Sequence, residues 1–260
     1  MKSKVVRLFI AMVLCAIAMT TAMAEDKGKN SAMVKPKVIF FDVNETLLDL
    51  ESMQDSVAKA LGGRKDLLPL WFSTMLHHSL VDSATGQYHL FGDIGTAALM
   101  MVAEANGITL TEAEARAAIV TPMLQLPPHP DVVKGLQALK DQGYTLVSLT
   151  NSTNKGVQKQ FENAGLTDLF DRRLSIEDIQ VYKPHLLTYQ WAAKQLGVEL
   201  DETLMVAAHG WDVAGAKAAG MQTAFVARPG KVMYPLGMEP DYVVSDLVEL
   251  AETLKRREKE

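Results

Sequence analysis

The sequence predicts an α/β protein that is built on a mostly parallel sheet and carries a helical subdomain after its first strand. Short apolar runs of strand type alternate with helical patterns over most of the chain. This alternation is interrupted once, because residues 50 to about 126 are almost wholly helical in pattern. The composition of the 260 residues, 48% hydrophobic and 22% charged, is that of a globular protein and excludes wholesale disorder.

Residues 1–24 are predicted to be a secretory signal peptide rather than part of the fold. They combine a basic flank, a short apolar core and a small-x-small end: Lys2, Lys4 and Arg7, then residues 8–19, then Ala22-Met23-Ala24. The apolar core is shorter than the ~20 residues that cross a bilayer comfortably. An N-terminal membrane anchor is the alternative.

The predicted cleavage before Glu25 would remove Cys15, the single cysteine of the chain. A mature protein without thiols suits an oxidising compartment, so we expect it to be periplasmic or secreted and free of the membrane. Residues 25–33 are expected to form a disordered lead-in to the first strand. The net charge of −5, without a basic stripe, argues against a nucleic-acid partner.

Five continuous apolar runs predict strands that are buried on both faces of the sheet. They are Val38–Phe41, Thr145–Leu149, Thr203–Ala208, Thr223–Val226 and Tyr242–Val244. Helices are predicted between them, over residues 132–142, 155–164, 186–196 and 213–219, and a glycine follows each, as is common at helix C-termini: Gly143, Gly165, Gly197 and Gly220. Residues 34–50 and 127–255 are therefore predicted to form a Rossmann-like doubly wound parallel sheet core.

The helical insertion, residues 51–126, is predicted to be a cap subdomain. Its helical patterns cover residues 52–61, 67–83, 94–106 and 111–124, and the turn Pro127-Pro128-His129-Pro130 closes it. The insertion leaves the sheet where the first strand ends, and ligands of open parallel sheets bind beyond the carboxyl ends of the strands. We therefore expect a lid over a ligand site, with an extra packing layer as the alternative.

Polar side chains gather directly after the predicted strands. The first strand is followed by Asp42-Val43-Asn44-Glu45-Thr46, the second by Thr150-Asn151-Ser152, and the third by His209-Gly210-Trp211-Asp212. Lys183 precedes Pro184 just before the next predicted helix. Each residue alone has an ordinary explanation, such as a helix cap, a solvated lysine or a structural histidine. Four such groups in this order are difficult to attribute to packing.

These segments resemble the four motifs of the haloacid dehalogenase superfamily. The motifs correspond to residues 41–47, 149–151, 181–184 and 206–212, and the resemblance covers essentially all of residues 34–250, including the cap. Within the superfamily the sequence is most similar to the type II 2-haloacid dehalogenases. The features that point there are Tyr189, six residues after Lys183, and the Trp211-Asp212 pair.

The resemblance implies a catalytic role for several of these residues. Asp42 would displace halide from the α-carbon of the substrate and form an ester that water then hydrolyses. Lys183 would hold Asp42 ionised and could also pair with the substrate carboxylate. Asp212 would anchor Lys183. The residues that the resemblance assigns to substrate binding or positioning are Thr46, Thr150, Asn151, Tyr189, Phe72 and Trp211, with Asn151 helping to cradle the leaving halide.

Asn44 separates the two large branches of the superfamily. Phosphatases usually have aspartate at this position, as general acid for an alkoxide leaving group, whereas asparagine cannot deliver a proton. Halide leaves without one, so Asn44 favours hydrolysis of short 2-haloalkanoic acids, such as chloroacetate or 2-chloropropionate, without metal or cofactor. The alternatives are a Mg²⁺-dependent phosphatase and a non-catalytic small-molecule-binding relative. The expected partners are the halogenated acid and water, and the resemblance suggests a homodimer.

Two residues depart from the pattern of the family. Phe72 stands where an arginine of the halide cradle is expected, and His209 stands where relatives more often have asparagine. An imidazole is suited to deprotonating the water that attacks the Asp42 ester. Glu45 could hydrogen-bond His209 and fix its tautomer, so we hypothesise a Glu45–His209 dyad as the base. The alternative for Glu45 is a carboxylate at a helix N-terminus.

Overall fold

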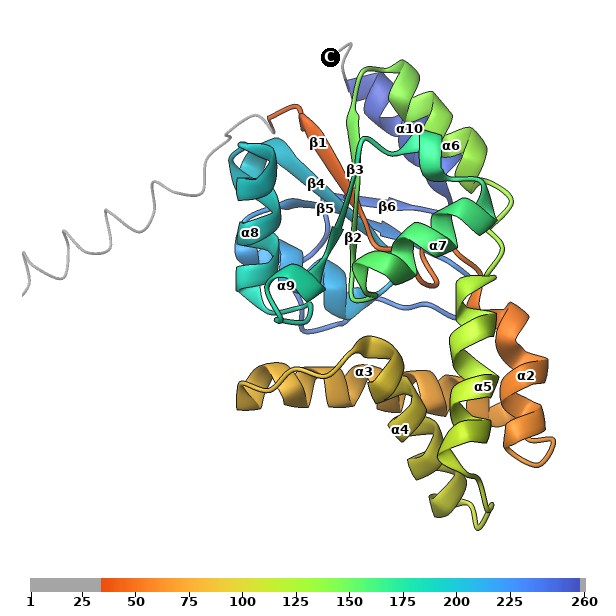
Figure 1. The fold of residues 1–260 in the computed structure, drawn as a ribbon. Coiled ribbons are helices and arrows are strands. Elements are labelled where there is room, and N and C mark those ends of the chain that lie inside the picture. The colour runs from red at the N-terminus through yellow and green to blue at the C-terminus, as the bar shows by residue number, and fades with distance from the viewer. Residues whose placement is uncertain (1–33, 258–260) are drawn as a thin grey trace, which may run out of the picture. The chain divides into compact units, whose positions relative to one another are not determined.

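The computed structural model describes residues 34–257, and the predicted signal peptide and lead-in lie outside this range. Six parallel strands form one sheet in the order β3-β2-β1-β4-β5-β6 (Figure 1). The strands are β1 Val38–Phe41, β2 Thr145–Thr150, β3 Arg172–Ser175, β4 Thr203–Ala207, β5 Gln222–Val226 and β6 Tyr242–Val244. The strand order reverses beside β1, which pairs with β2 on one side and β4 on the other.

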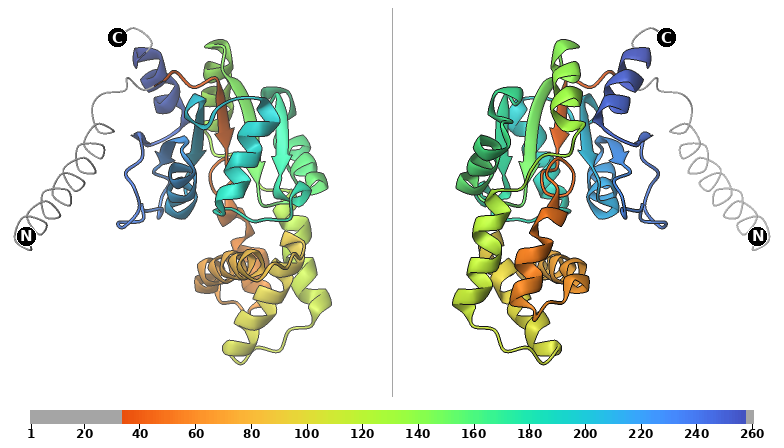
Figure 2. Two further views of the ribbon diagram at one scale, coloured as in Figure 1. Left: turned by 90° about the vertical axis from the view of Figure 1, so that its left-hand side faces the viewer. Right: turned by 90° about the vertical axis from the view of Figure 1, so that its right-hand side faces the viewer.

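Helices cover both faces of the sheet (Figures 1 and 2). On one face lie α6, α7 and α10 (Val132–Asp141, Asn154–Ala164 and Leu247–Arg257), and on the other lie α8 and α9 (Leu186–Leu196 and Gly210–Ala219). The side chains of β1 alternate between the two layers: Ile39 and Phe41 belong to the first apolar cluster, Val38 and Phe40 to the second. The predicted doubly wound α/β class is confirmed.

The sequence patterns missed one strand and one helix. The strand β3 is an edge strand with the sequence Arg-Arg-Leu-Ser, and only Leu174 and Ser175 are buried. It lacks a continuous apolar run because a strand at the sheet edge does not need one. The helix α10 buries Leu247, Leu250, Ala251 and Leu254 along a single stripe. That stripe packs on α6, where a Cβ on Gly135 would come within 2.4 Å of Leu247.

The insertion after β1 forms four helices that pack on one another. They are α2 Gln54–Ala60, α3 Leu68–Thr85, α4 Phe91–Ala105 and α5 Glu112–Leu124. Fully buried Trp71 ties α3 to α4, because its Nε1 donates a hydrogen bond to the carbonyl of Gly95 over 2.9 Å. These helices lie beyond the carboxyl end of β1 (Figure 1). No helix within residues 34–257 has the length and apolar character needed to cross a membrane.

Candidate active site

Asp42 lies at the point where the strand order of the sheet reverses. It follows β1 directly, and the last residue of that strand, Phe41, is in register with Ser148 of β2 and Val206 of β4. The carboxyl ends of these three strands therefore meet around Asp42, which is only 6% exposed. An open parallel sheet binds its ligands at such a point.

Asp42 belongs to a buried inner network with Lys183, Asp212 and Tyr189. Lys183 Nζ donates to Asp42 Oδ1 over 2.9 Å and to Asp212 Oδ2 over 2.6 Å. The Tyr189 hydroxyl donates to Asp212 Oδ1 over 2.6 Å. Helix α9 approaches this network closely because Gly215 has no side chain: a Cβ there would meet Pro184 Cβ at 2.4 Å and the Tyr189 hydroxyl at 2.9 Å. The network is therefore closed to solvent.

Within the inner network, Lys183 and Asp42 favour each other's charged forms, whereas burial and the charge of Asp42 raise the pKa of Asp212 despite Lys183. Burial alone would raise the pKa of Asp42, but Lys183 and His209 lower it far below its usual range. Burial alone would lower the pKa of Lys183, but Asp212 and Asp42 raise it. Burial, together with the charge of Asp212, raises the pKa of Tyr189, which stays a hydrogen-bond donor. Asp42 is thus an anion at neutral pH, as a carboxylate nucleophile must be.

The loop after β1 fixes the second oxygen of Asp42. Thr46 Oγ1 donates to Asp42 Oδ2 over 2.7 Å and accepts a hydrogen bond from the backbone of Ala208 over 2.9 Å. The Thr46 carbonyl accepts two hydrogen bonds from Arg228, whose guanidinium also pairs with Asp131. The loop is therefore tied both to the end of β4 and to the segment after β5.

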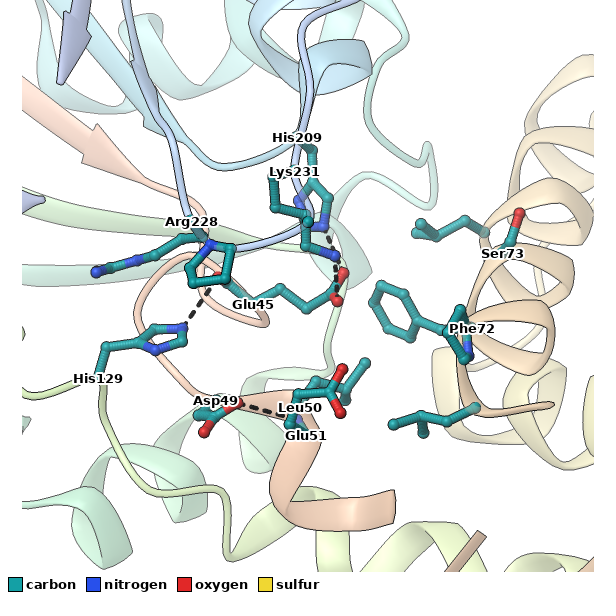
Figure 3. Close-up of a pocket in the computed structure, with 15 residues that line it drawn as sticks. Glu45, Asp49, Leu50, Glu51, Phe72, Ser73, His129, His209, Arg228 and Lys231 are labelled. Atoms are coloured by element: carbon teal, nitrogen blue, oxygen red, sulfur yellow. Dashed lines mark hydrogen bonds and ion pairs between the residues drawn. The ribbon is translucent and has the colours of Figure 1, made fainter. Parts of the chain in front are cut away.

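An outer network of Glu45, His209 and Lys231, shown in Figure 3, joins Asp42 through His209. His209 Nδ1 is 3.1 Å from Asp42 Oδ2, and its Nε2 is 2.7 Å from Glu45 Oε2. Lys231 Nζ donates to Glu45 Oε1. Glu45 has a φ of 64°, in the left-handed region that residues with a side chain rarely adopt. This backbone conformation orients the carboxylate toward both cations.

His209 is protonated and is the second cation of the outer network, beside Lys231. Burial alone would lower the pKa of His209, but its hydrogen bonds to Asp42 and Glu45 raise it to about 9. Burial alone would raise the pKa of Glu45, but His209 and Lys231 lower it. The sequence suggested an imidazole titrating near neutrality. The tertiary structure differs because each ring nitrogen faces a carboxylate.

A cavity of about 490 Å³ between the cap and the sheet reaches the outer network (Figure 3). Glu45, His209, Arg228 and Lys231 line it from the core side, and Leu68, Phe72 and Leu76 line it from α3. Asp42 itself does not line the cavity, whereas His209, whose Nδ1 faces Asp42 Oδ2, does. The Phe72 ring stacks over His209 with ring centres 6.3 Å apart, so this residue lies on the cavity wall as an apolar contact.

The remaining predicted residues surround Asp42 at different depths. Trp211 stacks on His209, with ring centres 5.2 Å apart, and its ring lies 5.9 Å from Lys183 Nζ. Asn151 is buried, and its Oδ1 accepts a hydrogen bond from the Lys183 backbone over 3.2 Å. Thr150 Oγ1 accepts one from the backbone of Ser152 over 3.1 Å. The cavity walls do not include Trp211, Asn151 or Thr150.

Two expected substrate contacts stay predictions. Lys183 Nζ is fully buried between the carboxylates of Asp42 and Asp212. The Tyr189 hydroxyl donates to Asp212, and Tyr189 does not line the cavity. Glu45 also stands in a loop, which removes the alternative of a carboxylate at a helix N-terminus.

The side-chain amide of Asn44 is hydrogen-bonded at both ends. Gln160 Nε2 donates to Asn44 Oδ1 over 2.9 Å, and Asn44 Nδ2 donates to Ser152 Oγ over 3.3 Å. Both ends of the amide are thus used in structure. Across residues 34–257, no three His, Cys, Asp or Glu side chains are grouped to hold a metal ion.

The sequence reasoning missed Arg228 and Lys231. Both follow β5, whose last residue is Val226, in the same way that Asp42 follows β1 and His209 follows β4. The rule that ligand groups follow the strands would have found them. His129, in the proline-rich turn, also belongs to the site: its Nε2 lies 3.2 Å from the Glu45 carbonyl, and it lines the cavity.

Sequence comparisons agree with the motifs. The model of a hydrolase family described as haloacid dehalogenase-like hydrolase matches residues 36–220. Haloacetate dehalogenase H-2 of Moraxella sp. (strain B) is 31% identical over 213 residues, which are 82% of this chain and 95% of the relative. An (S)-2-haloacid dehalogenase of Pseudomonas sp. (strain YL) is 33% identical over 221 residues, 84% of this chain and 95% of the relative.

Structure comparisons extend the similarity to the whole described fold. The L-2-haloacid dehalogenase of Xanthobacter autotrophicus superposes with a TM-score of 0.79 at 28% identity, over 85% of this chain and 99% of that one. Its structure with chloropropionic acid covalently bound gives a TM-score of 0.79 at 27% identity, over 85% and 98% of the two chains. From its motifs, its fold and these similarities, the chain belongs to the haloacid dehalogenase-like hydrolase family.

Proposed function

We propose that this protein hydrolyses short 2-haloalkanoic acids to 2-hydroxy acids through an ester on Asp42. The observation that carries the proposal is a buried, ionised Asp42 that is followed two residues later by an amide instead of an acid. The relatives support the substrate class. One is named a haloacetate dehalogenase and another an (S)-2-haloacid dehalogenase, and a similar structure holds chloropropionic acid covalently.

In the first step a carboxylate oxygen of Asp42 attacks the α-carbon of the substrate. The new C–O bond forms as the C–X bond breaks, and the halide leaves with the electron pair. Lys183 keeps Asp42 ionised for this attack. Access requires His209 to shift, because this side chain lines the cavity and contacts Asp42, which does not line it.

In the second step water attacks the Asp42 carbonyl carbon, and His209 takes its proton. Formation of the ester removes the negative charge of Asp42, one of the two groups that hold His209 protonated. The pKa of His209 then falls toward neutrality, and the imidazolium releases its Nδ1 proton to solvent before water attacks. Because Nε2 faces Glu45, the basic nitrogen is Nδ1, which faces Asp42. Collapse of the tetrahedral adduct breaks the acyl C–O bond, and the leaving alkoxide takes the proton from His209. Asp42 is regenerated as a carboxylic acid and returns its own proton to His209, which restores the starting charges.

The phosphatase alternative is weaker on the same residues. An alkoxide leaving group needs a proton, and Asn44, with its amide engaged by Gln160 and Ser152, cannot supply one. Halide departs without protonation, so dehalogenation does not need a general acid at position 44. A non-catalytic binding role would leave the ionised Asp42 and its two flanking cations, Lys183 and His209, without a purpose.

The direct test is halide release from chloroacetate, bromoacetate and both 2-chloropropionate enantiomers, with and without EDTA. We expect release that EDTA does not change, and inverted configuration at the α-carbon, since only the first step touches that carbon. p-Nitrophenyl phosphate serves as the competing substrate. EDTA-sensitive phosphate release without halide release would favour the phosphatase. No turnover of any of these substrates would favour the non-catalytic binding protein.

The covalent route and the dyad have their own tests. A single turnover in ¹⁸O-water should place label in the Asp42 carboxylate and not in the product, because water attacks the protein carbon. In rapid-quench experiments, His209→Ala and Glu45→Gln should accumulate the Asp42 ester, detected as a mass increase on that peptide. If neither variant accumulates ester, the dyad is not the base.

A further inference from the structure

Lys231 and His209 share a single carboxylate. Lys231 Nζ contacts Oε1 of Glu45 while His209 Nε2 contacts Oε2 over 2.7 Å. The Lys231 side chain is 26% exposed and the Glu45 side chain 13% exposed, so the pair is only partly screened by solvent. The charge of Lys231 therefore acts on His209 through the Glu45 carboxylate, which both side chains contact.

The loop that carries Lys231 is fixed against the loop that carries His209. A Cβ on Gly210, the residue after His209, would meet the Tyr234 backbone nitrogen at 2.6 Å and the Val232 carbonyl at 2.8 Å. Arg228 ties the other end of the segment to the Thr46 carbonyl over 3.0 and 3.1 Å. Lys231 therefore stands on a segment that is anchored on both sides of the outer network.

We propose that Lys231 is a positioning residue that neutralises part of the Glu45 charge and so keeps His209 able to release its proton. This rests on the proposed function, in which His209 alternates between base and acid. Glu45 alone would bind the imidazolium too firmly for a base. With Lys231 on the second oxygen, Glu45 still fixes the ring but attracts the proton less strongly.

The other titratable and charged groups near His209 lie on several elements, and most are engaged with partners other than the Glu45 carboxylate. Asp42 follows β1, and Lys183 reaches His209 only through Asp42, on which both converge. Asp212, on α9, is directed to Lys183 and Tyr189. His129 contacts the Glu45 carbonyl and not its carboxylate. Arg228 is engaged by Asp131 and Thr46, so Lys231 is the cation that balances the Glu45 carboxylate against His209.

The test compares Lys231→Met with Lys231→Arg and Lys217→Met. Lys217 pairs with Asp241 over 2.6 Å on the α9 side of the core, and its side chain is 24% exposed, so it is a matched control for loss of an ion pair. The primary measurement is the NMR titration of the His209 ring in selectively labelled protein. The second is the pH profile of ester hydrolysis in single turnovers of bromoacetate.

We expect Lys231→Met to raise the midpoint of the His209 titration by about half to one pH unit, since a positive charge is removed from its vicinity. Ester hydrolysis near pH 7 should slow by about 3- to 10-fold and recover at higher pH. Lys231→Arg and Lys217→Met should both titrate like the wild type. Urea unfolding checks that each variant is folded.

An unchanged His209 titration in folded Lys231→Met would overturn the proposal, as would a shift of equal size in Lys217→Met. If Lys231→Met does not fold, Lys231→Gln takes its place with the same expectations. A wild type that releases no halide contradicts the proposed function instead, and the NMR titration then decides the role of Lys231 by itself.

Discussion

The two networks that meet at Asp42 both pair carboxylates with cations, but in different surroundings. In the inner network, Lys183 is 1% exposed and lies between Asp42 and Asp212. In the outer network, Glu45 lies between two cations, Lys231 and His209, at the wall of the cavity. The inner network therefore fixes charge, whereas the outer network can exchange a proton.

Burial explains the difference between the two networks. A buried ion pair cannot lose one partner without leaving an unsolvated charge, so its protonation states are locked together. Groups at a cavity wall keep access to water and substrate, and their pKa values respond when a neighbour changes charge. The following variants test this contrast.

The largest effect is expected from the residue that both networks share. Asp42→Ala removes the nucleophile, and halide release should fall by at least about 10⁴-fold, as for the loss of a covalent catalytic residue. Ion-selective measurement of chloride or bromide checks this. Circular dichroism confirms that the variant is folded. Residual activity above about one per cent of the wild-type rate would point to another nucleophile.

Loss of Lys183 should be the most damaging change for stability. Lys183→Met leaves Asp42 and Asp212 buried without their shared cation, which should cost about 3–5 kcal/mol at neutral pH. Because both carboxylates can accept protons, the cost should shrink as the pH falls. Urea unfolding at pH 7 and pH 4 measures it. Equal unfolding midpoints for variant and wild type at pH 7 would contradict the buried network.

His209 should stabilise the fold in a pH-dependent way. Its pKa rises from an ordinary value of about 6.5 to about 9 in the folded chain, so protonated His209 stabilises the folded state. This contribution is fully present below pH ~6.5 and lost as the pH rises through about 9. Its maximum, relative to His209→Asn, should be about 3 kcal/mol.

The check on His209 is urea unfolding of wild type and His209→Asn from pH 6 to pH 10. The stability difference between them should decline across this range. A difference that does not depend on pH would show that packing against Phe72 and Trp211, rather than charge, accounts for it.

The smallest effect concerns the backbone of Glu45. At a φ of 64° a residue with a side chain pays a conformational cost that glycine avoids. Glu45→Gly should therefore be more stable than Glu45→Ala by about 1 kcal/mol, although both lose the same ion pairs. Thermal unfolding of the two variants measures the difference. An alanine variant as stable as the glycine variant would mean that the loop relaxes on losing its contacts.

Asp42, Lys183 and His209 could be predicted because they belong to motifs at fixed positions in the chain. Asp42 and His209 follow apolar strands, and Lys183 precedes a proline at the start of a helix. A parallel sheet brings such positions together whatever the details of the loops. The Glu45–His209 contact was also anticipated, and the structure has it at 2.7 Å.

The charge balance of the outer network depends on loop conformations that the local sequence does not encode. Lys231 is 186 residues from Glu45 in the chain, and its position after β5 suggests a site residue without saying which group it pairs with. The protonation of His209 likewise follows from two carboxylates that meet only in the folded chain. The edge strand β3 was missed for a related reason, because half of its residues face solvent or are only partly buried.

The sequence by itself determined the α/β class, the helical insertion and the residues around Asp42, because hydrophobic periodicity and strand ends are local properties. The tertiary structure decided which side chains share a charge, how far each is removed from water, and that Asp42 lies behind His209 rather than on the cavity wall. Electrostatic energies depend on distance and burial, and both are set by segments that are far apart in the chain.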